Sequence, residues 1–337
     1  MKKSNRHVPA HEIDAIAGAV RAGDRRALGR AITLVESRRD ADRPRAEALL
    51  EALVAYRGDA IRIGISGVPG VGKSTFIERF GRHVIENGHR VAVLAVDPSS
   101  SVSGGSILGD KTRMEELGRN AKAFIRPSPT GGTLGGVARR TREAIALCEA
   151  AGYDVVIVET VGVGQSETAV KDMTDMFMLL LSPTGGDELQ GMKRGIVELA
   201  DLILVNKADG ALEAAALDTV SNYRNAVHLL RPASPNWAVP VDACSALAGT
   251  GIAEVWRHVE AYRKALGDSG EIAARRKAQT KSRLWSEVGE SLLANLRAHR
   301  DVKQLLPALE KDVVEGRIAV AQAARRLLAA FLGSSAS

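Results

Sequence analysis

Long apolar segments are absent from this chain of 337 residues. No apolar run approaches the roughly 18 residues that a membrane-spanning helix requires, so the sequence predicts no membrane span. The first residues, MKKSNRHVPAHEID, are charged and lack the apolar stretch of a secretory signal. We therefore expect a protein that works in the cytoplasm and has no membrane partner.

Cysteines and aromatic residues are also few. The two cysteines, Cys148 and Cys244, lie far apart in the sequence and do not have the spacing of a metal site. This usage fits a reduced, cytoplasmic setting. Aromatic residues make up only 4% of the chain, which predicts a core built mainly from aliphatic side chains.

The positive charge has no accompanying pattern that indicates nucleic acid. The formal net charge is +6, but most lysines and arginines are interspersed with acidic residues, as in RRALGRAITLVESRRDADRPRAEALLE. No aromatic residues alternate with these charges to stack on bases. The sequence therefore predicts solvated helix faces and no nucleic-acid partner, with a functional basic patch as the less favoured alternative.

The sequence divides into three regions, with boundaries expected near residues 57 and 266. Residues 1–57 predict a helical extension, in which Gly23 interrupts one helix, Asp24 caps the next and Pro44 lies near the start of a third. Residues 58–266 alternate helical patterns with short apolar runs, which are IRIGIS, RVAVLAVD, DVVIVET, MFMLLL, DLILVNK and WAVPVDACSA. Continuous apolar runs of this kind predict an α/β fold with a mainly parallel sheet and helices on both faces.

Residues 267–337 predict a second helical region. Leu284, Val288, Leu292 and Leu296 recur at helical spacing and predict one apolar face. Two uses of this face stay open, which are packing onto the α/β domain and forming the interface of a homodimer.

A phosphate-binding loop is predicted directly after the first strand. The stretch GVPGVGKST follows IRIGIS, and we expect it to open a helix at Thr75. Glycines let backbone N–H groups curl around phosphates, and a helix N-terminus adds a partial positive charge. Lys73 is expected to reach the β- and γ-phosphates, and the Ser74 hydroxyl to ligate Mg²⁺. The predicted nucleotide-binding residues of this loop are Gly67, Val68, Pro69, Gly70, Val71, Gly72, Lys73, Ser74 and Thr75.

The base is predicted to be guanine. The tetrapeptide NKAD, residues 206–209, ends the later strand DLILV. A carboxylate at Asp209 can accept hydrogen bonds from N1–H and N2–H₂ of guanine, whereas adenine would leave the charge unsatisfied. Lys207 can lay its alkyl stem along the base. Asn206 and, downstream, Ser245, Ala246 and Leu247 complete the predicted base pocket, so we expect GTP and GDP in preference to ATP.

Three acidic residues are candidates for the metal and the attacking water. Asp97, Asp110 and Glu159 stand at predicted strand ends or in loops on the carboxyl edge of the sheet. Together with Ser74 they form the predicted Mg²⁺ ligands, and Lys73, Asp97 and Glu159 are the predicted catalytic residues. Each acid alone could instead cap a turn, but three such acids at one nucleotide site favour the functional interpretation, and which of them ligates the metal directly stays open.

One residue expected for hydrolysis is absent. In many GTP-hydrolysing proteins the stretch VIVETVGVGQ would read Asp-x-x-Gly-Gln, with the glutamine orienting the attacking water. Here Glu159 replaces the aspartate and Val163 stands at the glutamine position. The sequence therefore predicts slow hydrolysis by the protein alone and stimulation by a partner.

With these motifs, the chain resembles the MeaB/ArgK-type P-loop GTPases, the auxiliary proteins of methylmalonyl-CoA mutase. GVPGVGKST, DPSSSVSGGSILGDKTRM, ETVGVGQSE and NKAD stand in the family's order and at its spacing, over essentially the whole length. The resemblance implies a homodimeric GTPase domain with helical extensions. It also implies a chaperone that binds an adenosylcobalamin-dependent mutase, gates loading of its cofactor and protects it from inactivation.

The resemblance also suggests roles for individual residues. It likens Asp110 to a switch I metal ligand, Glu159 to the Walker B acid and Asp97 to an acid near the γ-phosphate. It implies that the charged loop at residues 182–195, SPTGGDELQGMKRG, communicates with the mutase.

Three other classes of P-loop protein fit the sequence less well. A metallochaperone GTPase for another metalloenzyme is less favoured, because the seven histidines are scattered and form no Cys/His cluster. A signal-recognition GTPase would need a methionine-rich module, and no methionine follows Gly270. A P-loop kinase of small molecules is disfavoured by the NKAD motif.

Overall fold

The computed structural model describes residues 10–37, 39, 41–56, 58–96, 114–127, 134–160, 166–183 and 194–333. The chain forms two compact units, Met1–Arg275 and Arg276–Ser337. The predicted helical extension at residues 1–57 belongs to the first unit together with the α/β region. The predicted boundaries near residues 57 and 266 stay a prediction.

The first unit is built around a seven-stranded sheet in the order β3-β2-β4-β1-β5-β6-β7. All neighbouring strands in it are parallel. The strands are β1 Ile61–Gly67, β2 Val91–Val96, β3 Ala123–Arg126, β4 Val155–Thr160, β5 Met176–Leu181, β6 Leu202–Val205 and β7 Val241–Ala243. The predicted α/β fold is confirmed, and six strands coincide with predicted apolar runs. The edge strand β3 was not predicted.

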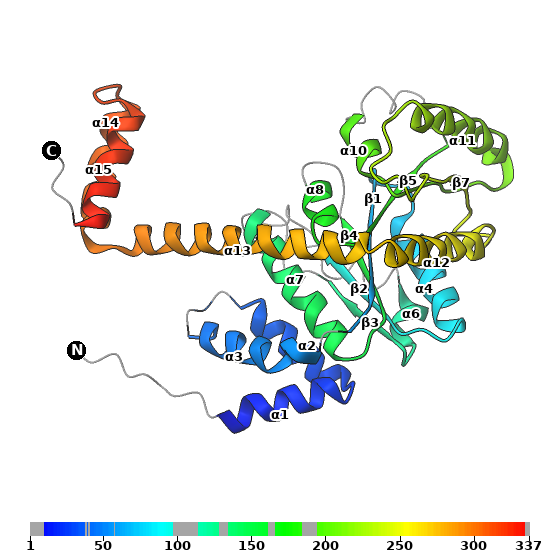
Figure 1. Cartoon of the computed structure of the whole chain (residues 1–337), viewed down its shortest axis with the longest axis horizontal. Coiled ribbons are helices and arrows are strands. Elements are labelled where there is room, and N and C mark those ends of the chain that lie inside the picture. Colours follow the sequence, from blue (N-terminus) through cyan, green and yellow to red (C-terminus); the bar gives the residue numbers. More distant parts are fainter. Residues whose placement is uncertain are drawn as a thin grey trace. The chain divides into compact units, whose positions relative to one another are not determined.

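Helices cover both faces of the sheet (Figure 1). One face packs against α4 Lys73–Glu86, α6 Glu115–Arg119 and α12 Ile252–Asp268. The other packs against α7 Leu134–Ala150, α8 Ser166–Lys171, α10 Arg194–Leu199 and α11 Glu213–His228. The described part of this unit also contains the 3₁₀ turns η1 Val54–Tyr56 and η2 Gly210–Leu212. Because both faces are covered, the central strands are buried along their whole length, which explains their continuous apolar runs.

The N-terminal helices extend one of these two layers. They are α1 Ala10–Arg21, α2 Arg25–Val35 and α3 Arg43–Leu53. The Oδ1 atom of Asp24 accepts hydrogen bonds from the backbone N–H groups of Arg26 and Ala27, at 2.7 and 3.0 Å. The predicted cap of α2 is thus confirmed. These bonds favour the carboxylate and lower the pKa of Asp24 below its usual value.

A glycine lets α8 approach the centre of the sheet. A Cβ atom at Gly64, in β1, would lie 2.6 Å from Cγ1 of Val170 and 2.9 Å from Oγ1 of Thr174. Such distances are below van der Waals contact, so only glycine allows α8 and the following turn to pack directly on β1.

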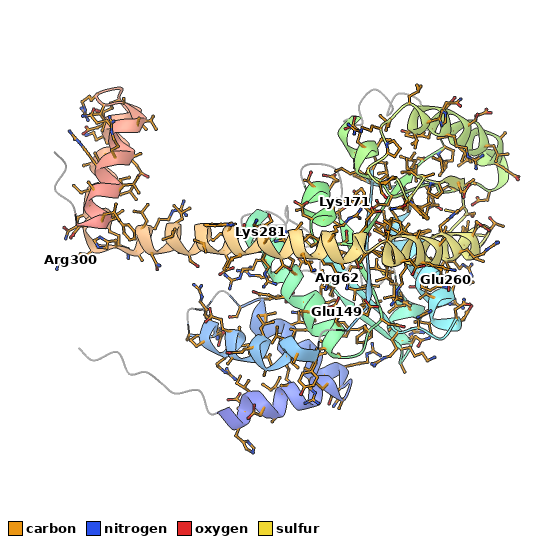
Figure 2. The ribbon with its side chains drawn as sticks, in the orientation of Figure 1. Arg62, Glu149, Lys171, Glu260, Lys281 and Arg300 are labelled. Carbon is orange, nitrogen blue, oxygen red and sulfur yellow. The ribbon has the colours of Figure 1, made fainter. Side chains whose placement is uncertain are left out.

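A buried ion pair ties two elements at the amino edge of the sheet. Arg62, in β1, donates to the carboxylate of Glu149, in α7, through Nε at 2.6 Å and Nη2 at 3.0 Å (Figure 2). The side chain of Glu149 is fully buried and that of Arg62 is 19% exposed. The two-point geometry fixes the orientation of both side chains.

The second unit is helical. It contains most of α13 Glu271–Ala298, with α14 Arg300–Val314 and α15 Val320–Leu332. Val302 and Leu309 of α14 and Ala323 of α15 are buried, whereas α13 has no buried residue. The predicted apolar row on α13 includes Leu284 and Leu292, which are 61% and 55% exposed. Among the described residues, no helix combines the length and apolarity needed to cross a bilayer.

Candidate functional site

The phosphate-loop residues connect the end of β1 to the start of α4. The helix begins at Lys73, two residues earlier than predicted, because Gly72 occupies the N-cap position with a φ of +93°. A Cβ atom at Gly72 would also lie 2.8 Å from Nδ2 of Asn206. Both the backbone conformation and the close approach therefore require glycine there.

Lys73 lies inside this loop. Its side chain is largely buried, and Nζ donates hydrogen bonds to the carbonyl oxygens of Gly67 at 2.7 Å and Val68 at 3.2 Å. Burial lowers the pKa of Lys73 below its usual value, against the opposing effect of the Glu159 and Glu167 carboxylates. An ammonium group held here at the start of a helix makes this loop a candidate site for anions.

Ser74 and Glu159 bring two oxygen atoms that could ligate a metal ion together beside the loop. The Ser74 hydroxyl donates to Oε1 of Glu159 at 3.3 Å. Glu159 is buried near the end of β4, where its backbone pairs with Ile65 of β1 and Ala95 of β2. A hydroxyl and a carboxylate are ligands that Mg²⁺ prefers, so the donor set fits this metal. The described residues contain no group of three or more His, Cys, Asp or Glu side chains that could hold a metal alone.

A hydrogen bond also joins the ends of β1 and β4. The hydroxyl of Thr160, which follows Glu159, donates to Oγ of Ser66 at 2.9 Å, and both side chains are fully buried. This bond holds the strand end that carries Glu159 against the strand that leads into the phosphate loop. No motif in the sequence indicates this pair.

Asn206 connects the phosphate loop to the predicted base pocket. It follows the end of β6 and is 1% exposed. Its Nδ2 donates to the carbonyl oxygen of Val71 at 2.9 Å, and its Oδ1 accepts from the backbone N–H of Ala246 at 3.0 Å. One side chain thus contacts both halves of the candidate site.

The predicted base-pocket residues lie together at the carboxyl edge of the sheet. Ser245 donates from Oγ to Oδ2 of Asp209, and it accepts from the backbone N–H of Ala248 at 3.0 Å. Lys207 has a φ of +64°, which is unusual for a residue with a side chain. Leu247, at the tip of the loop, is 75% exposed. The structure therefore brings NKAD and the loop at residues 245–247 together.

Arg79 is a contact of this loop that the sequence analysis missed. It lies on the second turn of α4, and Nη2 donates to the carbonyl oxygen of Leu247 at 2.9 Å. Its Nε donates to the carbonyl oxygen of Ala246 at 3.4 Å. No short motif marks this arginine, and only its position on the helix that follows the phosphate loop could have pointed to it.

Several predicted residues lie outside the described part of the chain. These are Asp97, Asp110 and Val163, together with residues 184–193 of the predicted partner loop. The structure therefore brings together Lys73, Ser74 and Glu159 of the predicted catalytic and metal set, and the roles of Asp97 and Asp110 stay predictions.

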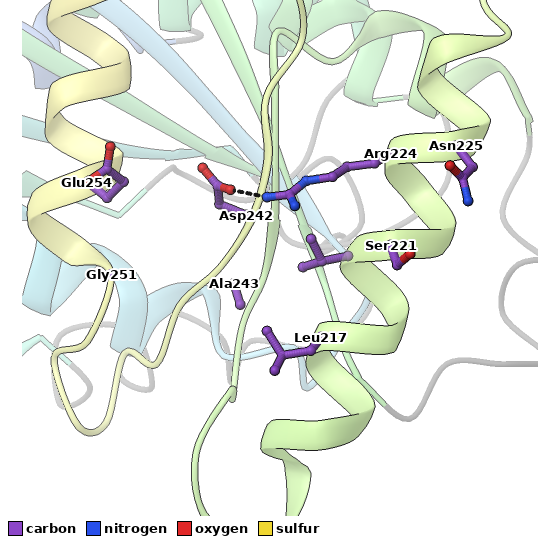
Figure 3. A pocket seen from close by; sticks show the side chains of 9 residues that line it. Leu217, Ser221, Arg224, Asn225, Asp242, Ala243, Gly251 and Glu254 are labelled. Atoms are coloured by element: carbon purple, nitrogen blue, oxygen red, sulfur yellow. Dashed lines mark hydrogen bonds and ion pairs between the residues drawn. The ribbon is translucent and has the colours of Figure 1, made fainter.

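A separate pocket of about 560 Å³ lies beside β7, between α11 and α12 (Figure 3). Arg224, on α11, crosses it to reach Oδ1 of Asp242 at 2.7 Å, and its Nε donates to the carbonyl oxygen of Val241 at 2.9 Å. These bonds attach α11 to the outer edge of the sheet. None of the predicted site residues lines this pocket.

The family model described as methylmalonyl-CoA mutase-associated GTPase MeaB matches residues 28–301. The chain is 56% identical to a protein of Caulobacter vibrioides described as a GTPase, covering 96% of this chain and 99% of that one. It is 49% identical to the mitochondrial methylmalonic aciduria type A homolog of Mus musculus, over 92% of this chain and 77% of the relative. Among solved structures, a LAO/AO transport system kinase is 38% identical, with a TM-score of 0.75 over 95% of this chain and 98% of its own.

Proposed function

The chain belongs to the MeaB family of methylmalonyl-CoA mutase-associated GTPases, and we propose that it binds GTP and GDP and hydrolyses GTP at the site around Lys73 and Asp209. The observation that carries this proposal is the pair of hydrogen bonds made by Asn206, to the phosphate loop and to the base loop. A nucleotide that spans this side chain would have its phosphates and its base held by one connected set of residues.

In the proposed complex, the phosphate loop binds the charged end of the nucleotide. The Lys73 ammonium group leaves the carbonyl oxygens of Gly67 and Val68 and turns to the β- and γ-phosphates. Ser74 and Glu159 would hold Mg²⁺, which would supply positive charge to neutralise the charge that develops on these phosphates. The N-terminus of α4 adds backbone N–H groups to the same end.

The base is selected by the carboxylate of Asp209. Its oxygens accept from N1–H and N2–H₂ of guanine, while the Ser245 hydroxyl holds one of them in place. Adenine has an acceptor at N1 and no 2-amino group, so binding it would leave the charge of Asp209 unsatisfied.

The proposed role of hydrolysis is to time an interaction with a partner. Val163 cannot orient water, so turnover by the protein alone is slow. The partner is an adenosylcobalamin-dependent mutase, as the names of the family and of its mouse relative suggest. The protein acts in the cytoplasm as a chaperone that gates cofactor loading and protects the mutase from inactivation. The GTP and GDP states must bind the mutase with different affinities, because a ligand shifts only an equilibrium whose two states it binds differently.

We include a homodimer in the proposal. Leu284 and Leu292 of the apolar row on α13, and Trp285 beside it, are more than half exposed, and these exposed apolar side chains support a contact with a second copy. Sedimentation of the unmodified protein and of Leu284→Glu would test it, because a charge in such a contact should shift the equilibrium to the monomer.

Nucleotide selectivity tests the central claim. The unmodified protein should bind GTP more tightly than ATP. The Asp209→Asn variant should lose affinity for GTP and gain affinity for xanthosine triphosphate, because the amide can donate a hydrogen bond where xanthine accepts one. Equal affinity of the unmodified protein for ATP and GTP would contradict the proposal.

Turnover with the partner tests the timer. Saturating methylmalonyl-CoA mutase should accelerate GTP hydrolysis, and Lys193→Ala and Asp187→Ala should reduce that stimulation. Stimulation that survives both substitutions would exclude these two side chains from the coupling, whereas no stimulation at all would contradict the timer.

A further inference from the structure

Arg79 joins the helix of the phosphate loop to the loop at residues 245–247. It lies on the second turn of α4, which begins with Lys73. Its guanidinium reaches the carbonyl oxygens of Leu247 at 2.9 Å and Ala246 at 3.4 Å. A guanidinium carries a permanent positive charge and several donors in a fixed plane, so one side chain can hold two adjacent carbonyl groups.

Two other hydrogen bonds join this loop to the NKAD residues. The N–H of Ala246 donates to Asn206, and the hydroxyl of Ser245 donates to Asp209, so both bonds involve the NKAD residues. Arg79 instead binds carbonyl oxygens, from α4. Its guanidinium also lies against Gly249, where an added Cβ would be 3.6 Å from Cζ and Nε. The loop is therefore held from two sides, by the NKAD segment that follows β6 and by α4.

Within the loop, the side chain of Leu247 has little apolar anchorage. Ala246 is buried in the core, whereas Leu247 is 75% exposed. Because the side chain of Leu247 is not buried, the backbone at this residue depends on polar contacts to keep a single conformation. The bond from Arg79 to the carbonyl group of Leu247 is such a contact.

We propose that Arg79 is a positioning residue for guanine recognition, which holds the loop at residues 245–247 in the conformation that closes over the base. This inference rests on the proposed function, because it assumes that guanine occupies the pocket formed by Asp209 and Ser245. Arg79 touches neither base nor phosphate in this proposal. Its loss should therefore weaken retention of the base and leave the phosphate contacts of Lys73 intact.

The test compares Arg79→Gln with the unmodified full-length protein. Release of a fluorescent GDP should become about tenfold faster, as expected for the loss of charge-assisted hydrogen bonds. The association rate and the weak affinity for ADP should not change. The preference for GDP over ADP should thus fall by about tenfold, a difference that general destabilisation of the fold would not produce.

Two further variants test whether the effect depends on the contact between Arg79 and the loop. Arg79→Lys should recover part of the slow release, because one ammonium can reach one carbonyl oxygen. Arg82→Gln is the matched control, since Arg82 lies on the same helix and pairs with Glu116 of α6. It should release GDP at the unmodified rate.

The outcomes separate this inference from the proposed function. If the unmodified protein shows no preference for GDP over ADP, both fall. If that preference is present and Arg79→Gln keeps it, with unchanged release of GDP, the inference about Arg79 is overturned and the proposed function stands. Equal acceleration in Arg79→Gln and Arg82→Gln would also overturn it, because the effect would not depend on contact with the loop.

Discussion

The side chain of Asn206 is bonded to Val71 across the candidate site, with Nδ2 donating to the carbonyl oxygen at 2.9 Å. Val71 belongs to the phosphate loop, whereas Asn206 follows β6. The close approach of Asn206 to Gly72 explains why the loop has no side chain at that position. The two halves of the site are therefore already joined by the protein.

Replacing Asn206 should damage both halves at once. Asn206→Ala removes the bonds to Val71 and Ala246 and leaves their buried backbone groups without these partners, at a cost of about 1–3 kcal/mol in the free energy of unfolding. GDP affinity should fall by about tenfold or more. Thermal unfolding and calorimetric titration measure the two effects. Asn225→Ala, on the exposed face of α11, should change neither.

The oxygen donors beside the loop should control metal-dependent hydrolysis. Ser74→Ala and Glu159→Gln should each lower Mg²⁺-dependent GTP turnover by ~10²–10³. Their combination should cost less than the product of the two effects, since both act on one metal. Chelation of Mg²⁺ should reduce the unmodified protein to a similar rate. Normal turnover by Glu159→Gln, measured with and without the mutase, would exclude Glu159 from the site, and Glu116→Gln on α6 is the control.

Removing one partner of the ion pair between Arg62 and Glu149 should destabilise the protein more than removing both charges. Arg62→Met leaves a fully buried carboxylate without this partner and should cost about 3–5 kcal/mol in the free energy of unfolding. The double variant Arg62→Met with Glu149→Gln should recover part of that loss. Arg263→Met, which breaks an exposed pair with Asp59, should cost less than about 1 kcal/mol. Denaturant unfolding of the four proteins gives the comparison.

The two thiols should be inert in the folded protein. Burial raises the pKa of Cys244 to about 12, and it raises that of Cys148 as well. Because the thiolate is the reactive form, a thiol reagent at pH 8 should modify neither cysteine before unfolding and both in denaturant. A rapid reaction of one thiol in the native protein would show that its surroundings open.

Much of the fold follows from local patterns in the sequence. The strands β1, β4 and β5 were predicted because their apolar runs are continuous, as burial on both faces requires. The strand β3 was missed because it has only four residues, AFIR, and lies at the edge of the sheet, where its last two side chains are partly exposed. Asp24 was recognised as a cap because its side chain acts on backbone groups two and three residues away.

Part of the candidate site could also be predicted from the sequence, and part could not. The proximity of the phosphate loop and NKAD could be predicted, since the carboxyl ends of parallel strands meet at one edge of a sheet. The contacts of Arg79 and of the pair Ser66–Thr160 could not, because each joins residues that are far apart in sequence and no motif relates the two partners to one another. The apolar row on α13 was predicted, but its spacing does not say what covers it.

Gly64 has a consequence at the level of the gene. A single base change in a glycine codon can introduce alanine, serine, cysteine, valine, arginine, tryptophan, aspartate or glutamate, and every one of these carries a Cβ atom. That atom would overlap Val170 and Thr174, so each replacement must displace α8 from β1. Codon 64 should therefore accumulate synonymous changes and almost no missense changes among natural variants of this gene, even though it lies outside every nucleotide-binding motif.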